Sequence, residues 1–289
     1  MDKDYSPSAM QTFDFCQTKW QLEREGWVPK IATRKLIAAC WSTGAHAGFA
    51  EYGRLKLAGD DDKTHLHTCA SHVAASEWLT EIDHYLKYGV CFGTLDIEER
   101  RQDLVKLVTK WCNTHLFGVG WELLAVELPL GEQENARPDV IAREPGGNLV
   151  VVDYKVKYEV NSKWFNIDEW VSEFAHDFKQ IYYTQAVAQH YKQPCTRHYV
   201  YGVTAKPFDQ VLTPFDVANL ELHTRTGADL QSRMTFASQA LLRGEQLPGH
   251  TTHRSVYGTC ELLNACTLYR LNPEQMALEY VKVPRREKR

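Results

Sequence analysis

The segment ARPDVIAREPGGNLVVVDYK at residues 136–155 has the plainest structural pattern in the sequence, two apolar runs separated by a polar turn. The pair Gly146-Gly147 in that turn is a good sign of a β-hairpin. The second run, 149–152, is continuously apolar, which is typical of a strand covered on both faces. The segment therefore predicts two antiparallel strands, the second of them in the interior of a sheet.

Two acidic residues and a lysine occupy related positions in this hairpin. Asp139 falls in the first strand, and Asp153 and Lys155 lie near the end of the second. Residues equally far from the turn face each other in an antiparallel pair, so both carboxylates project to the same end of the sheet. Side chains alternate along a strand, so Lys155 lies on the same face as Asp153.

This arrangement points to a chemistry. Two facing carboxylates repel unless a cation lies between them, and hard oxygen ligands suit Mg²⁺ or Mn²⁺. A lysine beside such an ion orients a water or stabilises the charge that builds on a phosphate. The pattern therefore indicates metal-assisted phosphodiester hydrolysis. The alternative is a surface hairpin with ordinary charges, although an unpaired charge after so apolar a strand is costly.

The rest of the sequence predicts an α/β fold in which a central mixed β-sheet is flanked by helices, with a helical N-terminal elaboration. No linker or repeat interrupts it, so we expect a single domain, 1–289. Its parts are a mainly helical segment at 1–115, the α/β core at 116–215 and a C-terminal helical segment at 216–289. Apolar spacing predicts helices within 6–27, where Ser8 is cap-like, and at 34–57, 66–89, 96–115 and 172–192, and further strands at 121–130 and 196–205.

Composition excludes several classes of protein. The chain of 289 residues is 44% hydrophobic and 24% charged, values typical of globular proteins. Its net charge of −4 argues against a coat-like DNA-binding protein but not against an enzyme with an acidic metal site. No apolar run reaches the ~18 residues of a membrane span, and the start MDKDYSPSAM lacks a signal-peptide layout. We therefore expect a cytoplasmic protein without membrane contact. The basic tail KVPRREKR is either solvated or in weak contact with phosphate.

The hairpin residues, with other short motifs in the same order, resemble the PD-(D/E)XK nuclease superfamily. They resemble in particular its RecB-like exonuclease branch, which includes CRISPR-associated and phage-encoded relatives. The resemblance implies a restriction-endonuclease-like core. It identifies Asp139 with the family's first aspartate and Asp153 and Lys155 with its D/E-x-K pair. It also makes the backbone carbonyl of Tyr154 a further metal ligand.

Motifs on either side of the hairpin extend the resemblance. STGAH at 42–46 is similar to a Gly-x-x-x-His motif whose histidine binds metal, which identifies His46, although Ser42 replaces the glycine. A histidine that caps a helix is the alternative. Glu127 resembles the acidic residue that precedes the catalytic hairpin and is a further candidate metal ligand. Gln180 and Tyr183 resemble the Gln-x-x-x-Tyr helix that touches substrate, here with a spacing of three; the alternative for Tyr183 is a core aromatic.

Two late cysteines resemble part of the family's iron–sulfur staple. Cys260 and Cys266 have its five-residue gap, and Cys16 is the distant N-terminal partner that the resemblance implies. Because Tyr257 stands where another cysteine is expected, His253 or His250 is left as the fourth ligand. A [4Fe-4S] cluster, a Zn²⁺ site and buried thiols without metal all remain open.

The resemblance implies a DNA nuclease that requires Mg²⁺ or Mn²⁺. More specifically, it implies an exonuclease that hydrolyses single-stranded DNA or DNA ends in recombination or repair. A recombination or CRISPR-type protein partner would fit that role. The alternatives are a catalytically inactive nuclease-fold module that binds nucleic acid or a protein, and an RNA nuclease that shares the site.

Overall fold

The structure is a computed structural model that describes most of the chain. The described residues are 9–10, 12–13, 16–115, 120–131, 136–160, 165–174, 178–217, 229, 232–241, 254–255, 258–259, 273–284 and 286. The chain divides into two compact units, one formed by 1–37, 81–95 and 225–289 and the other by 38–80 and 96–224. The single domain expected over 1–289 stays a prediction.

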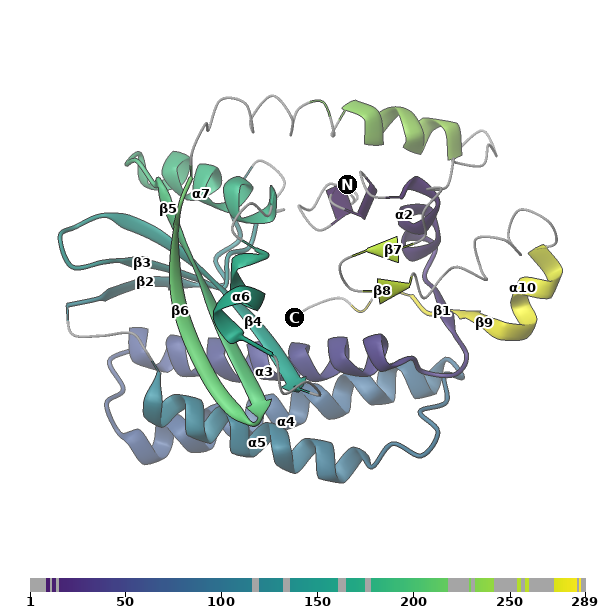
Figure 1. The fold of residues 1–289 in the computed structure, drawn as a ribbon, viewed down its shortest axis with the longest axis horizontal. Helices are drawn as coiled ribbons and strands as arrows, with labels where there is room; N and C mark the ends of the chain where they lie inside the picture. Colours follow the sequence, from purple (N-terminus) through teal and green to yellow (C-terminus); the bar gives the residue numbers. More distant parts are fainter. Residues whose placement is uncertain are drawn as a thin grey trace. The chain divides into compact units, whose positions relative to one another are not determined.

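The second unit contains a five-stranded sheet in the order β2-β3-β4-β5-β6 (Figure 1). Strands β4 and β5 are parallel, and the other neighbouring pairs are antiparallel. This mixed sheet with helices around it confirms the predicted α/β fold and is consistent with a restriction-endonuclease-like fold. The strands are β2 (Glu122–Val126), β3 (Val140–Arg143), β4 (Leu149–Glu159), β5 (Arg197–Lys206) and β6 (Phe208–Asp216).

Strands β3 and β4 form the predicted hairpin. Their register pairs Val140 with Val152 and Arg143 with Leu149. The turn needs glycine, because φ is +106° at Gly146 and +89° at Gly147. Residues 149–154 of β4 are all buried, as the continuous apolar run predicts for a strand covered on both faces.

Helices cover both faces of this sheet (Figure 1). One layer contains α3 (Arg34–Leu57), α4 (Lys63–Lys87) and α5 (Ile97–Thr114). A Cβ at Gly44 or Gly48 of α3 would lie 2.9 Å from a backbone oxygen of α4, so these glycines allow the two helices to approach closely. On the other face, α6 (Ile167–Ser172) packs on β5 and β6, and α7 (Phe178–Tyr191) packs on β4 and β5.

Several element boundaries differ from those expected. Within the helical segment expected at 6–27, residues 9–10 and 12–13 are helical, and α2 covers Gln17–Arg24. The Cys16 sulfur accepts a hydrogen bond from the Lys19 amide at the start of α2. The helix expected at 172–192 begins only at residue 178, after the separate α6. Strand β6 was not predicted, and the C-terminal segment expected to be helical also contains short strands. These are β7 (Arg254–Ser255), β8 (Gly258–Thr259) and β9 (Tyr280–Lys282).

In the first unit, the two end regions of the chain form a small sheet. Strand β1 (Trp27–Pro29) pairs antiparallel with β9, which follows α10 (Pro273–Glu279). Gly26 has φ +79°, and a Cβ there would lie 2.3 Å from the carbonyl oxygen of Val283. Only glycine therefore allows the backbones to meet at this point. No helix in the described part of the chain has the length and hydropathy that crossing a bilayer requires.

Candidate active site at the β3–β4 hairpin

Asp153 is the central group of the candidate site. Its side chain is fully buried on β4, at the end of the apolar run. Two ammonium groups approach it: Lys155 Nζ lies 2.7 Å from Oδ2, and Lys179 Nζ lies 2.9 Å from Oδ1. Lys155 is two residues along the same strand, whereas Lys179 comes from α7 on the facing helical layer. The carboxylate is thus removed from water but not left without a partner.

Charge around Asp153 shifts the protonation equilibria of the site. Burial opposes ionisation of Asp153, but Lys155 and Lys179 outweigh it and hold the pKa of this carboxyl well below its usual range. Burial likewise disfavours the charged form of Lys179, but Asp153 outweighs it and raises the pKa of this ammonium group. Asp153 and Lys179 therefore stay ionised together at neutral pH.

Asp139 lies immediately before β3 rather than within it. Continued by one residue, the β3–β4 register sets Asp139 opposite Asp153, as the hairpin pattern predicted. Its Oδ2 accepts a hydrogen bond of 2.7 Å from the backbone amide of Tyr154. Its Oδ1 lies 3.3 Å from Nδ1 of His46 on α3. Residues 93 positions apart in the sequence, His46 and Asp139, thus meet at the end of the hairpin.

Helix α7 supplies the two substrate-helix candidates. Gln180 is fully buried, and neither its amide oxygen nor its amide nitrogen has a hydrogen-bond partner among the described residues. Tyr183 is 6% exposed, and its ring centroid lies 5.3 Å from Lys179 Nζ. Burial is the main cause that raises the pKa of Tyr183 above its usual value. Tyr183 also belongs to the apolar cluster beneath α7, which agrees with the alternative of a core aromatic.

Glu127 lies close to the site through its backbone, because its amide donates to the carbonyl of Asp139. Its carboxylate, however, forms a 2.6 Å ion pair with Arg54 of α3. The residue also adopts a positive φ of +47°, which is unusual for a non-glycine residue. A metal-ligand role for Glu127 stays a prediction.

The proposed staple is only partly within the described residues. Cys16 is buried, and its sulfur caps the start of α2. Cys260, Cys266, His250 and His253 lie outside the described residues. The staple therefore stays a prediction.

Lys179 is a charged group of this site that the sequence did not lead us to predict. It stands four residues before Tyr183, so the two share a face of α7, and this helical spacing was the available signal. Lys155 and Phe174 lie in the same surroundings, since Lys155 Nζ lies 4.7 Å from the Phe174 ring centroid.

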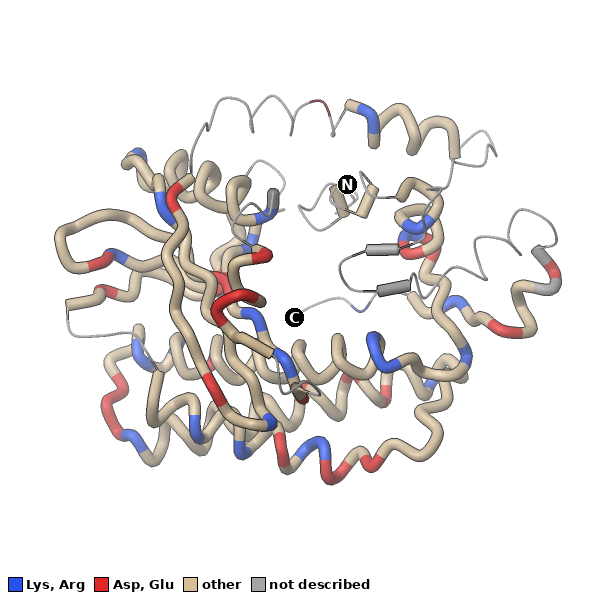
Figure 2. Tube along the Cα trace, viewed as in Figure 1, with Lys and Arg blue, Asp and Glu red and all other residues tan. Residues whose placement is uncertain are grey.

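Basic and acidic residues are interspersed along the layer of α3, α4 and α5 (Figure 2). The positive charge near Asp153 therefore comes from Lys155 and Lys179, and not from a basic face of the α3–α5 layer.

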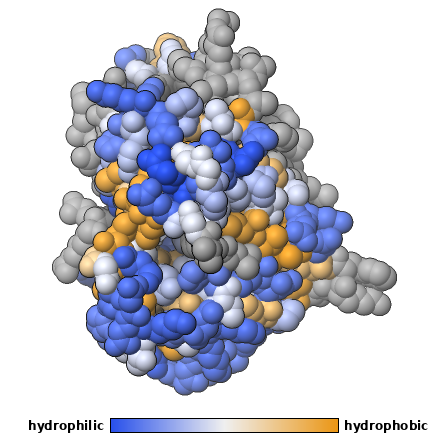
Figure 3. All heavy atoms as spheres, turned by 90° about the vertical axis from the view of Figure 1, so that its left-hand side faces the viewer, coloured by the Kyte–Doolittle hydropathy of each residue, from blue (hydrophilic) through white to orange (hydrophobic). Residues whose placement is uncertain are grey.

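A cavity of about 180 Å³ lies on the other face of the sheet. Its lining is mainly aromatic and includes Tyr154, whose side chain alternates with that of Asp153. Trp111 also lines it, and its buried Nε1 has no hydrogen-bond partner in the described part of the chain. The side of the molecule that faces left in Figure 1 shows apolar side chains in a band between hydrophilic areas (Figure 3). Because the cavity faces away from the Asp153 carboxylate, it is not part of the candidate active site.

The donor set fits a hard divalent cation. The β3–β4 register, continued by one residue, sets Asp139 and Asp153 opposite each other, and carboxylate oxygens are the ligands that Mg²⁺ and Mn²⁺ prefer. The His46 imidazole lies beside Asp139 as a further donor. Within the described residues, no three His, Cys, Asp or Glu side chains are already gathered as a metal site. Lys179 and Lys155 instead neutralise Asp153 directly.

A family model with the description "PD-(D/E)XK nuclease superfamily" matches residues 4–267. The matched range includes the hairpin, His46 and the α7 residues. Curated proteins give no match to this chain.

Proposed function

Because this chain belongs to the PD-(D/E)XK nuclease superfamily, we propose that it is a divalent-metal-dependent deoxyribonuclease whose centre contains Asp139, Asp153 and Lys155. Members of this superfamily are generally nucleases and typically use Mg²⁺ or Mn²⁺. The observation that carries the proposal is the buried Asp153 carboxylate, with Lys155 Nζ 2.7 Å away and Asp139 opposite it across the hairpin. A buried acid of this kind requires a functional or structural reason, because its desolvation is costly.

Each residue has a role in this proposal. The carboxylates of Asp139 and Asp153, the His46 imidazole and the Tyr154 carbonyl would hold the metal, with Glu127 as a further candidate. The chemistry that a divalent ion would supply there is activation of water and neutralisation of the scissile phosphate. Lys155 keeps an ammonium group beside the reacting phosphate, where it stabilises developing negative charge. The Gln180 amide, which has no hydrogen-bond partner among the described residues, and the Tyr183 hydroxyl orient the substrate from α7.

The main experiment compares the wild type with Asp153→Asn and Lys155→Gln on labelled single- and double-stranded DNA with Mn²⁺. Both variants are expected to lose activity by about a hundredfold or more, since each removes a group that acts on the transition state. Asp209→Asn is the matched control, because Asp209 is an exposed carboxylate on β6 of the same sheet. Circular dichroism checks that all variants are folded. Equal degradation by the wild type and Asp153→Asn would remove this mechanism.

We further propose that the protein is an exonuclease of the RecB-like branch, acting on single-stranded DNA or duplex ends in recombination or repair. The ordered motifs from His46 to Tyr183 support this assignment. Linear single-stranded DNA should be degraded while the closed circular form of the same sequence persists. Cleavage of the circle would instead identify an endonuclease. Labelled RNA of matching sequence distinguishes an RNA nuclease.

A catalytically inactive nuclease-fold module is the second candidate. It is favoured by one observation, the engagement of Asp153 by two ammonium groups, which already supplies positive charge at the carboxylate. Titration calorimetry with Mn²⁺ separates the two candidates. An enzyme should bind Mn²⁺ with an affinity that Asp153→Asn reduces. A module would bind nucleic acid or a protein with no heat of Mn²⁺ binding and no cleavage.

We also propose a metal staple that uses Cys16, Cys260, Cys266 and His253, with a [4Fe-4S] cluster ahead of Zn²⁺. Support comes from the β1–β9 pairing, because Trp27 follows Cys16 by 11 residues and Tyr280 follows Cys266 by 14. Anaerobically purified protein should be brown, and Cys266→Ala should remove the colour and the iron. Zinc without iron would identify the other metal, and the absence of both would leave plain thiols.

A further inference from the structure

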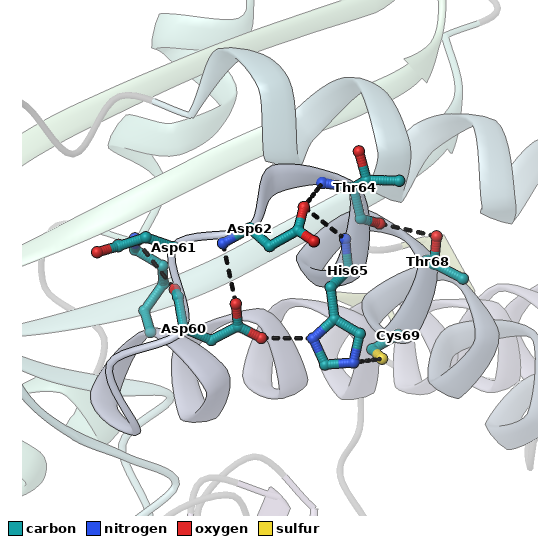
Figure 4. Close-up of polar contacts among 8 residues, drawn as sticks. Asp60, Asp61, Asp62, Thr64, His65, Thr68 and Cys69 are labelled. Atoms are coloured by element: carbon teal, nitrogen blue, oxygen red, sulfur yellow. Dashed lines mark hydrogen bonds and ion pairs between the residues drawn. The ribbon is translucent and has the colours of Figure 1, made fainter.

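Three neighbouring side chains, in the turn after α3 and the first turns of α4, have no role in the nuclease proposal. Asp60, His65 and Cys69 lie in sequence along the turn and the first turns of α4 (Figure 4). His65 and Cys69 are four residues apart, so they share one face of the helix. Their arrangement therefore follows from where α4 begins.

Asp62 stabilises the start of helix α4. Its Oδ1 accepts hydrogen bonds of 2.9 Å from the Thr64 amide and 3.4 Å from the His65 amide. An aspartate in this position satisfies backbone donors that the helix leaves unpaired. The remaining acid of the turn, Asp61, forms an ion pair with Lys56. The three aspartates at 60–62 therefore each make a different contact.

The distances describe a relay of hydrogen bonds. Asp60 Oδ2 lies 2.5 Å from Nδ1 of His65, and Nε2 of the same ring lies 3.2 Å from Sγ of Cys69. Asp60 is itself held, because its Oδ1 accepts a 3.0 Å hydrogen bond from the Asp62 amide. With Nδ1–H donating to Asp60, the lone pair of Nε2 faces the thiol. His65 is thereby set to take the proton of Cys69.

The hydrogen bond from Asp60 also acts on the ring. It is the main cause that raises the pKa of His65 above its usual value, so the ring is a better proton acceptor. A nucleophile, a base and a group that orients the base within hydrogen-bond reach form the general arrangement of an activated side chain. Here the nucleophile is a thiol.

Other cysteines of the described chain have different surroundings. Cys112 and Cys195 are buried, and burial raises the pKa of each thiol to about 12. Cys16 and Cys40 are buried as well. Cys91 is exposed, but its described contact is a backbone one, since its sulfur accepts from the Gly93 amide. Cys69 combines partial exposure with an imidazole neighbour.

We propose that Asp60, His65 and Cys69 form a reactive-thiol site whose substrate is a low-molecular-weight disulfide. His65 takes the proton of Cys69, and the thiolate attacks one sulfur of the disulfide. The Cys69–sulfur bond forms as the disulfide bond of the substrate breaks, and the leaving thiolate takes the proton from His65. Cys69 is oxidised to a mixed disulfide, and the leaving sulfur is reduced to a thiol. A second thiol compound reverses the step.

The test uses the full chain and glutathione disulfide, with peptide mass spectrometry to follow each cysteine over time. An unassisted thiol is only a few per cent ionised at neutral pH, so Cys69 should react about tenfold faster than the exposed Cys91. His65→Gln should reduce the rate at Cys69 to that of Cys91, and Asp60→Asn should reduce it in part. Thr68→Ala, an exposed neighbour on α4, is the matched control and should change nothing.

Equal rates at Cys69 and Cys91, or an unchanged rate at Cys69 in His65→Gln, would overturn the proposal. Because His65 has an exposed side chain, its substitution should leave folding intact, and a thermal melt checks this. Nuclease activity is measured on the same samples. Its presence or absence does not affect the outcome, since the readout is the mixed disulfide alone.

Discussion

Lys179 shares the Asp153 carboxylate with Lys155, although the two lysines come from different elements. Lys155 is part of the strand, whereas Lys179 reaches Oδ1 from α7, at 2.9 Å. In the proposed metal site, a divalent ion at Asp153 would meet repulsion from this second ammonium group, because like charges at such range interact by several kcal/mol at about ε 20. The affinity of the site for metal should therefore depend on Lys179 as well as on the acids.

Lys179→Gln is expected to lower the Mn²⁺ concentration needed for half-maximal activity by about tenfold, since it removes one of two competing cations. Measurement of cleavage rate against Mn²⁺ concentration checks this. Lys63→Gln, at an exposed lysine on α4, should leave the titration unchanged. A higher Mn²⁺ requirement in Lys179→Gln would mean that Lys179 assists metal binding instead.

Gln180 offers a test that separates stability from function. Its buried amide has no hydrogen-bond partner among the described residues, and an unpaired buried polar group costs about 1–3 kcal/mol. Gln180→Leu should therefore raise the free energy of unfolding by about 1 kcal/mol and also reduce DNA cleavage. Urea unfolding and the cleavage assay measure the two effects. A large loss of stability would show that the amide has a structural role.

At the scale of residues, the sequence predicted the hairpin groups because strand alternation and turn length determine where Asp139, Asp153 and Lys155 lie. Lys179 and His46 belong to helices, and their positions relative to Asp153 and Asp139 depend on packing between distant segments. Only the resemblance suggested His46. For Lys179 the available signal was its four-residue spacing before Tyr183, which places both on one face of α7 but does not show that this face meets Asp153.

At the scale of elements, Asp103 joins helix α5 to two strands. Its Oδ2 lies 2.7 Å from the Tyr158 hydroxyl of β4 and 2.6 Å from Lys206 Nζ at the end of β5. Burial opposes ionisation of Asp103, but Lys206 and Tyr158 outweigh it and lower the pKa of the carboxyl. A carboxyl with a lowered pKa in the folded state stabilises the fold at pH values above its unfolded pKa.

Asp103→Asn should therefore be less stable than the wild type at pH 7. The difference should shrink as pH falls from about 4 through the folded pKa, because the wild type then loses the same contribution. Thermal melts between pH 7 and pH 2 measure it, with Asp209→Asn as an exposed control. A stability difference that does not change with pH would rule out an electrostatic origin.

Elements were predictable where their apolar pattern is strong. The helix predicted at 96–115 is observed as α5, in which the apolar residues Leu104, Leu107, Val108 and Trp111 are buried at helical spacing. Strand β6 was missed because it forms an edge of the sheet and is mostly half-exposed, so its sequence FDQVLTPFD lacks a clear alternation. The break between α6 and α7 was missed because both carry apolar residues at helical spacing.

At the scale of the whole molecule, Gly26 should control how the end regions of the chain are joined. Gly26→Ala introduces strain at φ +79° and a contact of 2.3 Å with the Val283 oxygen. Gly89→Ala is a matched control, because Gly89 has φ +86° but nothing within 4 Å of its added Cβ. The control should cost about 1–2 kcal/mol and Gly26→Ala distinctly more.

Hydrogen exchange locates the effect of Gly26→Ala. Amides of β1 and β9 should lose protection in this variant, while those of β3 and β4 keep theirs. Equal loss of protection in the large sheet would mean that the two compact units unfold as one.

The two lysines beside Asp153 affect how the protein folds before it binds a metal ion. Carboxylates without counter-ions would couple metal loading to folding. Asp153 instead has two ammonium groups of the protein beside it. Under the proposed function, the chain would therefore fold before it binds magnesium or manganese, and DNA cleavage would begin only once the ion is bound.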